Sequence, residues 1–193
     1  QEWLQMAYGQ IEELYWTEDN VNEVTISQYF QETIARCAFL TFRGPLKYAG
    51  IVGNASTEDI QRLAKIGEYL LIGYHIKGDN LDLQPDSAAW GKVAGEDITI
   101  GRRTLLINEV IQAATPEDRA LIEKIISERT EDETKKRKVY ELIFKYKIMK
   151  KAENLAEEYN ARAKQEIDQL DISTSHRELL HDFSDYCTMT RAI

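Results

Sequence analysis

Residues 67–106 read GEYLLIGYHIKGDNLDLQPDSAAWGKVAGEDITIGRRTLL, and this stretch decides how the rest of the chain is interpreted. Its first half is apolar at helical spacing, which predicts a buried helix that ends near Leu83, just before Pro85 and Asp86. Its second half contains glycines and cationic residues, which predicts a loop. A helix that ends in carboxylates and faces a flexible basic loop can hold a divalent cation together with a polyanionic phosphate.

Three polar side chains near the end of this helix are spaced to share one face. His75 is followed by Asp79 four residues later and by Asp82 after three more, and residues at these intervals point the same way. Mg²⁺ takes one or two carboxylates together with substrate phosphate, so we expect Asp79 and Asp82 to be metal ligands. The alternative is a solvated helix end whose spacing is accidental.

The loop that follows carries the positive charge. Lys92, Arg102 and Arg103 lie within reach of a diphosphate bound at the helix end. They could instead neutralise the neighbouring acids Glu96 and Asp97. Both interpretations place the cations beside the carboxylate helix.

The rest of the chain also predicts helices, with no convincing strand pattern. Residues 1–16 have helical spacing, and Gly44-Pro45 is expected to interrupt the second helix. A single long helical stretch is expected to run from Thr130 to about Leu170. The predicted helix starts are Ser27, Ser56 with Asp59, Thr104, Thr115 with Pro116, Thr130 with Glu133 as the start of that stretch, and Ser173 or Thr174. We therefore expect an all-α fold with residues 1–193 forming one domain.

Composition excludes several classes of protein. The chain has a formal net charge of −9, which argues against a general affinity for nucleic acid. No apolar run approaches the roughly 20 residues of a membrane-spanning helix, and the first residues lack a signal-peptide pattern. Cys37 and Cys187 are isolated, which favours a reducing, cytoplasmic location.

One segment runs against this acidic average. Residues 135–151 contain eight lysines or arginines and one acid, Glu141. Such a basic stripe could attract a membrane surface or an acidic partner. The simpler interpretation is a solvated helix face.

The central stretch resembles the trans-isoprenyl diphosphate synthases, the polyprenyl synthetase family. YHIKGDNLD at 74–82 resembles the second aspartate-rich motif of the family, FQxxDDxxD, and GKVAGEDITIGRRT at 91–104 resembles its GKxxGxDLxxGKxT block. GQIEEL at 9–14 and ISQYFQETIARCAFLTF at 26–42 are similar to two further helices of the family, as are the helices of residues 152–191. The resemblance covers nearly the whole chain but only the later part of a full-length member.

This resemblance implies an isoprenoid synthase-type bundle of long helices around an apolar cavity. It implies an activity that condenses isopentenyl diphosphate with an allylic diphosphate, giving geranylgeranyl or polyprenyl diphosphates, with Mg²⁺ as cofactor. Asp79 and Asp82 correspond to the later aspartates of the second motif, as candidate metal ligands. The residues matched to diphosphate-binding positions are Arg36, His75, Lys92 and Arg102.

The chain departs from the family pattern at several points. His75 replaces the glutamine of the second motif, and Arg36 and Arg102 replace lysines. Gly78 replaces the leading aspartate of the second motif, Cys37 replaces a threonine, and the first motif, DDxxD, has no counterpart. We therefore expect an incomplete bundle that is competent only with its N-terminal half or with a partner subunit that carries DDxxD, in a homo- or hetero-oligomer. The alternative is a non-catalytic pseudo-subunit that dimerises with an active prenyltransferase and regulates it. A weaker alternative is an apolar cavity that simply binds a prenyl lipid.

Overall fold

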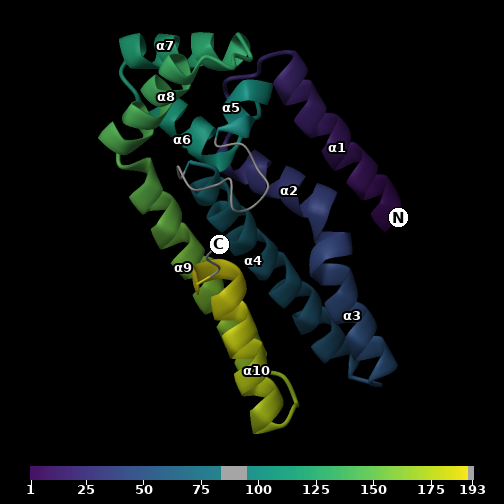
Figure 1. The fold of residues 1–193 in the computed structure, drawn as a ribbon. Coiled ribbons are helices and arrows are strands. Elements are labelled where there is room, and N and C mark those ends of the chain that lie inside the picture. The colour runs from purple at the N-terminus through teal and green to yellow at the C-terminus, as the bar shows by residue number, and fades with distance from the viewer. Residues whose placement is uncertain (84–94, 191–193) are drawn as a thin grey trace. The chain divides into compact units, whose positions relative to one another are not determined.

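The computed structural model describes residues 1–83 and 95–190, and their regular structure is entirely helical (Figure 1). The all-α prediction is thereby confirmed. Within the described residues, no helix is both long enough and apolar enough to cross a membrane. The helices are α1 (Glu2–Glu18), α2 (Ile26–Thr41), α3 (Arg43–Val52), α4 (Thr57–Asp82), α5 (Glu96–Ile100), α6 (Leu105–Ala113), α7 (Pro116–Ser127), α8 (Glu133–Lys145), α9 (Ile148–Asp168), α10 (Thr174–Asp185) and the π-helical turn η2 (Tyr186–Thr190).

Four helices, α4, α6, α7 and α10, begin at side-chain caps that the sequence predicts. A capping hydroxyl satisfies a backbone N–H that has no partner within the first turn of the helix. The confirmed caps are Ser56, Thr104, Thr115 and Ser173, each accepting a hydrogen bond from the backbone N–H three residues later. The second helix is interrupted, but at Phe42 and not at Gly44-Pro45, because α2 ends at Thr41 and Gly44-Pro45 lies in the first turn of α3.

The predicted start of α2 at Ser27 is wrong by two residues. Thr25 is the cap: its hydroxyl accepts the Gln28 N–H at 3.2 Å, while its own N–H donates to Gln28 Oε1 at 2.9 Å. This reciprocal pair is a capping box, and it satisfies two backbone donors where a lone serine would satisfy one.

The single stretch predicted from Thr130 to Leu170 is also wrong. Asp132 caps α8 by accepting the Thr134 N–H at 2.8 Å, so that helix begins later than expected. Lys147 then adopts a left-handed φ of 57°. Since a right-handed helix cannot continue through that conformation, α8 and α9 are separate helices.

The short helix α5 lies where only a loop was expected. Gly95 and Gly101 flank it with φ angles of 73° and 75°, which other residues rarely adopt. At Gly101 an added Cβ would also come within 3.1 Å of the Ile126 carbonyl oxygen. The two glycines therefore set the bounds of α5.

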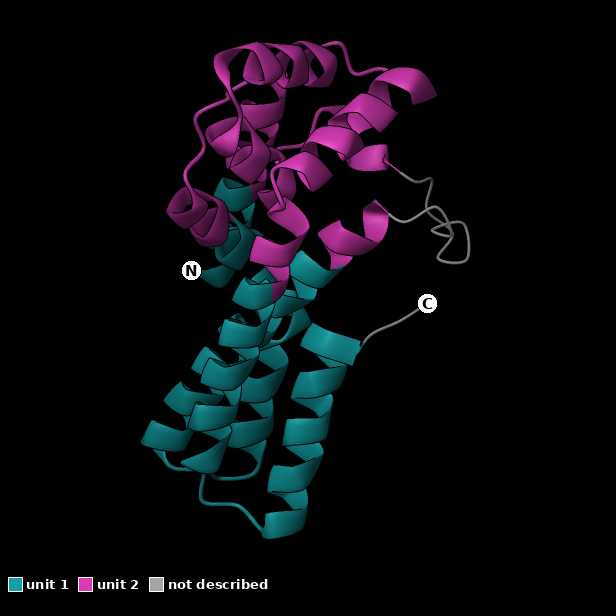
Figure 2. Cartoon of the chain, turned by 90° about the vertical axis from the view of Figure 1, so that its left-hand side faces the viewer, with its two compact units in different colours: residues 1–9, 33–77, 154–192 teal, residues 10–32, 78–153, 193 magenta. Residues whose placement is uncertain are grey.

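The chain divides into two compact units (Figure 2). Unit 1 comprises residues 1–9, 33–77 and 154–192, and unit 2 comprises residues 10–32, 78–153 and 193. Four helices, α1, α2, α4 and α9, contribute residues to both units.

Unit 1 is built on an apolar core shared by α2, α4, α9 and η2. Phe42 packs edge-on against Tyr74 and Phe183, with ring centroids 5.6 and 6.1 Å away. Gly67 allows α4 to approach the start of α3 closely, since an added Cβ would lie 2.6 Å from the Arg43 Cα. The buried core residues are Ala38, Phe42, Ile66, Leu70, Leu71, Ala163, Ile167, Leu170 and Cys187.

Unit 2 is built on contacts among α5, α6, α7 and α8. The helix α6 is apolar almost throughout, and six of its nine residues are buried. Its neighbours contribute further fully buried side chains, namely Ile98, Ile122, Ile126 and Ile143. This core supports the end of α4, where the predicted site residues lie.

Candidate functional site

The predicted metal-binding residues lie in the last turns of one continuous helix. The helix α4 runs without a break from Thr57 to Asp82, so His75, Asp79 and Asp82 keep the helical spacing that their shared face requires. His75 belongs to unit 1, while both aspartates belong to unit 2.

The Asp79 carboxyl group connects three helices of unit 2. Its Oδ2 accepts a hydrogen bond from the Tyr29 hydroxyl on α2 at 3.1 Å. The same oxygen accepts the backbone N–H of Leu105, the first residue of α6, at 3.3 Å. Both donors favour a negative charge at this position, and the start of a helix favours it further.

Burial outweighs those two donors. Desolvation, together with the charge of Asp97, raises the pKa of Asp79 from 3.8 to about 8, against the opposing hydrogen bonds from Tyr29 and Leu105. The nearby Asp82 adds to the rise. A cation at this site would favour the ionised form of the carboxyl group, because opposite charge lowers the pKa of a carboxyl group.

Asp82 marks the point at which α4 joins the following loop. Its side chain is buried, with 4% of the residue exposed. Its carbonyl oxygen accepts the Gly95 N–H at 3.1 Å. The last turn of α4 is thus tied directly to the start of α5.

Arg102 is paired with acidic side chains. Its guanidinium lies 2.8 Å from Asp97 Oδ1 and 2.8 Å from Glu13 Oε1. The Asp97 contact is the neutralising role that the sequence allowed for this arginine. With 40% of its side chain exposed, Arg102 can also be reached by a ligand.

Arg103 holds the backbone together. The residue is 3% exposed, and its guanidinium donates to the Val21 carbonyl at 2.7 Å, the Gly101 carbonyl at 2.8 Å and Asn22 Oδ1 at 3.1 Å. Burial, aided by the charge of Arg129, lowers the pKa of Arg103 to about 10. Arg103 thus fixes the chain between α1 and α2 against the end of α5. No pattern in the sequence indicates this role.

Tyr140 on α8 lies against the start of α5. An added Cβ on Gly95 would come within 1.9 Å of its hydroxyl oxygen. That oxygen is buried and has no hydrogen-bond partner among the described residues. Burial and the charges of Asp82, Glu133 and Asp97 raise the pKa of Tyr140, so the phenol stays protonated and can donate. No pattern in the sequence points to this residue.

The remaining predicted residues lie in other parts of the chain. Arg36 lies in α2, in unit 1. The backbones of α1 and α2 come close here, since a Cβ added to Gly9 would be 2.7 Å from the backbone nitrogen of Arg36. His75 is half-buried in α4. Lys92 lies outside the described residues. The structure therefore brings together Asp79, Asp82, Asp97 and Arg102, all in unit 2.

The described side chains do not form a complete protein cage for a metal. Within the ranges 1–83 and 95–190, no group of three or more histidine, cysteine or acidic side chains is placed to hold an ion. Gly78 offers no oxygen at the start of the motif. Asp79 and Asp82 fit an ion that draws most of its ligands from water and diphosphate, which is the usual habit of Mg²⁺.

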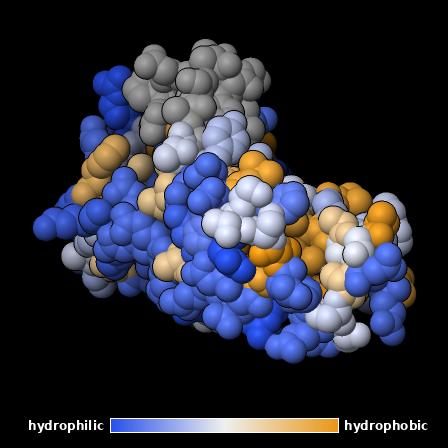
Figure 3. Space-filling view, turned by 90° about the horizontal axis from the view of Figure 1, so that it is seen from below, coloured by the Kyte–Doolittle hydropathy of each residue, from blue (hydrophilic) through white to orange (hydrophobic). Residues whose placement is uncertain are grey.

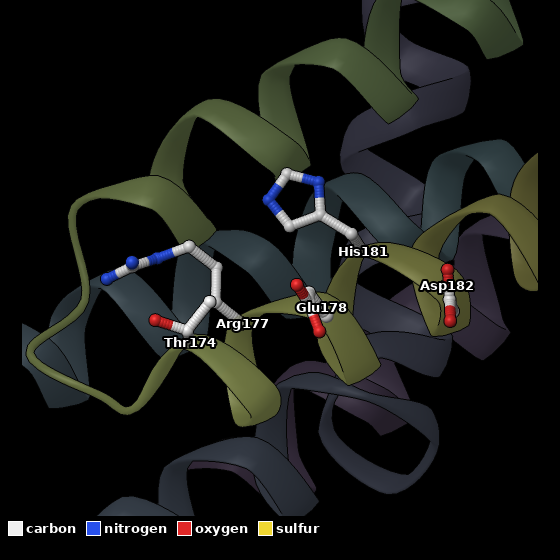
Figure 4. Close-up of a pocket in the computed structure, with 5 residues that line it drawn as sticks. All are labelled: Thr174, Arg177, Glu178, His181 and Asp182. Carbon is white, nitrogen blue, oxygen red and sulfur yellow. The ribbon is translucent and has the colours of Figure 1, made fainter.

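A surface hollow on α10 is unrelated to this motif. It is lined by Thr174, Arg177, Glu178, His181 and Asp182, all from one helix (Figure 4). Arg177 donates to the Leu170 carbonyl, and His181 pairs with Asp168 at 2.9 Å. These contacts join α10 to the end of α9 and assign no chemistry to the hollow.

Comparison with known proteins agrees with the geometry of α4 and α5. The family described as polyprenyl synthetase matches residues 1–143. The chain belongs to the polyprenyl synthetase family. The match includes every predicted site residue, so the resemblance noted in the sequence is confirmed.

Individual relatives of this polyprenyl synthetase chain are considerably longer. A short chain isoprenyl diphosphate synthase of Methanothermobacter thermautotrophicus is 26% identical over 85% of this chain and 49% of its own length. A nonaprenyl diphosphate synthase of Mycobacterium tuberculosis is 25% identical over 84% of this chain and 48% of its own length. The chain thus spans about half the length of the curated relatives it matches.

Solved structures show the same fold. A geranylgeranyl pyrophosphate synthase from Corynebacterium glutamicum, complexed with isoprenyl diphosphate and magnesium, matches with a TM-score of 0.87 and 23% identity. The match covers 96% of this chain and 52% of that one. The polyprenyl synthetase chain therefore has part of an isoprenoid synthase-type helical bundle.

Proposed function

We propose that this polyprenyl synthetase chain supplies the second-motif side of a trans-prenyltransferase that condenses isopentenyl diphosphate with an allylic diphosphate. One observation carries the proposal: Asp79 and Asp82 end α4 beside α5, and the Asp82 carbonyl is bonded directly to Gly95 of the basic block. The full activity requires a DDxxD motif from another segment or subunit.

In this proposal the described residues have distinct roles. Asp79 and Asp82 hold Mg²⁺, which when bound supplies the positive charge that stabilises a departing diphosphate. Arg102 exchanges its acidic partners for diphosphate oxygens, since an exposed guanidinium can form bidentate bonds with phosphate. By their match to the family motifs, Arg36, His75 and Lys92 are further candidates for contact with diphosphate.

An exposed apolar stripe on α1 supports the need for a partner. The spacing of its members places them on one side of the helix, opposite the buried Gly9 and Trp16. They are Trp3, Leu4, Tyr8, Ile11, Leu14 and Tyr15, each at least 51% exposed. Apolar residues are visible on the face shown in Figure 3. Contiguous apolar patches usually mark an interface, so we assign the α1 stripe to contact with the DDxxD-bearing segment or a second subunit.

The second candidate function is that of a non-catalytic regulatory subunit. Gly78 removes the leading carboxylate, and Cys37 removes a hydroxyl from the diphosphate position. The raised pKa of Asp79 also weakens its affinity for a cation at neutral pH. These features favour a chain that binds an active prenyltransferase without contributing a working metal site.

A reconstitution assay separates the two functions. The chain is mixed with a polypeptide that carries DDxxD, and incorporation of labelled isopentenyl diphosphate is measured with Mg²⁺. A catalytic contribution requires that Asp82→Asn lower the rate of the complex, with Asp171→Asn as a charge-matched control. Product formation that is unchanged by Asp82→Asn supports the regulatory role, and no product at any Mg²⁺ concentration defeats the catalytic one.

A cytoplasmic location is part of the same proposal. Neither Cys37 nor Cys187 forms a disulfide within the described residues, which fits a reducing compartment. Subcellular fractionation of the native protein tests this.

A further inference from the structure

The basic segment noted in the sequence forms one exposed face of α8 in unit 2. Residues 137, 138, 141, 144 and 145 are all exposed, and their spacing places them on one side of the helix. The opposite side of α8 carries Val139, Leu142 and Ile143, which are buried. The exposed face is thus a fixed feature of a helix anchored in the core.

About half of the cations in this segment are neutralised. Four lysines pair with acids of α7, α8, α9 or the intervening turns. These pairs are Lys135 with Glu128, Lys136 with Glu133, Lys145 with Asp118, and Lys150 with Glu153. The positive charge of these four lysines is therefore balanced by acids of the same chain.

The other four cations have no such partner. Arg137, Lys138, Lys147 and Lys151 are exposed and form no ion pair within the described part of the chain. The one acid among them is Glu141. Four free cations around one acid make this surface strongly positive on a chain whose formal net charge is −9.

An aromatic side chain lies on the same exposed face of α8 as Arg137 and Lys138. Phe144 is 61% exposed. Among residues 133–153, all described by the structure, no other large apolar side chain is exposed. A ring at this position can add apolar contact with an interfacial layer to the attraction exerted by the neighbouring cations.

We propose that Arg137, Lys138, Phe144, Lys147 and Lys151, here named the basic-aromatic surface, dock on the anionic face of a phospholipid bilayer. Lysines and arginines are attracted to anionic headgroups, and an aromatic ring enters the interfacial layer. A protein partner needs a complementary apolar area to bury, whereas a single ring between cations suits an interface without fixed shape. The docking is peripheral and reversible, and it does not depend on the proposed function.

Vesicle co-sedimentation of the chain tests the proposal. Phosphatidylcholine vesicles with and without phosphatidylserine are compared, at low and high salt. We expect binding only to the anionic vesicles, and loss of that binding at high salt, because the attraction decays within a Debye length. Absence of binding to anionic vesicles at low salt overturns the proposal.

Variants identify the surface that binds. Each Arg or Lys to Gln substitution at 137, 138, 147 or 151 should lower vesicle affinity about fivefold, and the fourfold variant should not bind. Lys65→Gln, an exposed lysine of unit 1, is the control and should bind as the parent does. Phe144→Ala should weaken binding without changing its salt dependence. Thermal unfolding by circular dichroism confirms that each variant is folded.

Two results would contradict this assignment. Full binding by the fourfold variant would place the membrane contact elsewhere. Binding to polyglutamate that exceeds binding to anionic vesicles would identify an acidic polypeptide, not a bilayer, as the partner.

Discussion

The Tyr29 hydroxyl on α2 donates a hydrogen bond to Asp79 Oδ2 on α4, and this contact joins two segments that are 50 residues apart in the sequence. It also stabilises the negative charge of Asp79, because it opposes the rise in the pKa of that residue. The hydroxyl of an otherwise apolar side chain thus takes part in the electrostatics of the candidate metal site.

Removal of that hydroxyl should weaken the fold and the site together. Tyr29→Phe deletes one hydrogen bond to a partly buried carboxyl group, so the free energy of unfolding should fall by about 1 kcal/mol. The pKa of Asp79 should rise further. Urea unfolding measures the first effect, and Tyr15→Phe, at an exposed position of α1, should leave stability unchanged. Equal stability of both variants would contradict the geometry.

The raised pKa of Asp79 predicts a pH dependence of a definite sign. The folded value, about 8, exceeds the ordinary value of 3.8, so folding favours the protonated form. The stabilisation that protonation gives is complete below pH 3.8 and is lost as the pH rises through 8.

Substitution by a neutral residue should remove that dependence. Asp79→Asn keeps an oxygen to accept from Tyr29 and Leu105 but cannot ionise. Relative to the parent chain, we expect this variant to gain stability between pH 5 and pH 9, measured by urea unfolding at each pH. Asp171→Asn, an exposed change of the same kind, is the control. A constant difference between Asp79→Asn and the parent at all pH values would be inconsistent with a buried carboxyl group.

The contact between Gly95 and Tyr140 predicts a severe effect of a single methyl group. Gly95→Ala combines a φ of 73° with an approach of 1.9 Å to the Tyr140 hydroxyl, and it should destabilise the chain by about 2 to 3 kcal/mol. Gly101→Ala has nearly the same φ, 75°, but its closest contact is 3.1 Å, so it should be milder. Adding Tyr140→Phe to Gly95→Ala should recover the difference, as a double-mutant cycle would show.

A restored carboxylate should strengthen metal binding. Gly78→Asp places an acid one residue before Asp79 and completes the aspartate pattern of the family. We expect tighter Mg²⁺ binding in the presence of inorganic diphosphate, by about tenfold, measured by calorimetry. Lys77→Glu, at the neighbouring half-buried position, provides a control for added negative charge alone. If both variants bind Mg²⁺ equally, the gain is general electrostatics and not coordination.

The expectation of one domain predicts cooperative unfolding. Four helices contribute to both compact units, so melting of one unit should disrupt helices of the other. Calorimetry should give a single transition whose van't Hoff and calorimetric enthalpies agree. Two resolved transitions would show that residues 1–193 form two domains.

Local signals account for most of what the sequence predicted correctly. The caps at Ser56, Thr104, Thr115 and Ser173 each require one hydroxyl and its own first turn, so they can be identified without tertiary structure. The T-x-x-Q pattern at Thr25 is equally local, and its reciprocal pair of hydrogen bonds with Gln28 makes Thr25 a stronger cap than the predicted Ser27.

The remainder depends on contacts between distant segments. The helix α5 has five residues, too few for a periodic pattern, and its bounds depend on the φ angles of two glycines. The pKa of Asp79 depends on Asp97 and on the Leu105 N–H, which only the fold brings close. The position of Arg103 just beyond the carboxylate helix predicts reach to a diphosphate, yet its guanidinium donates to Val21 and Asn22. No local pattern indicates these pairings.

The turn between α8 and α9 places a constraint on which residue can stand at position 147 of the basic-aromatic surface. Lys147 occupies a left-handed conformation, with a φ of 57°, that glycine adopts at lower cost. Glycine at this position would relax the backbone by about 1 kcal/mol and would remove one of the four free cations. A chain under selection for stability alone should drift to glycine here, whereas one under selection for attachment should keep the lysine. At position 147, lysine therefore favours membrane attachment, whereas glycine would favour stability of the fold.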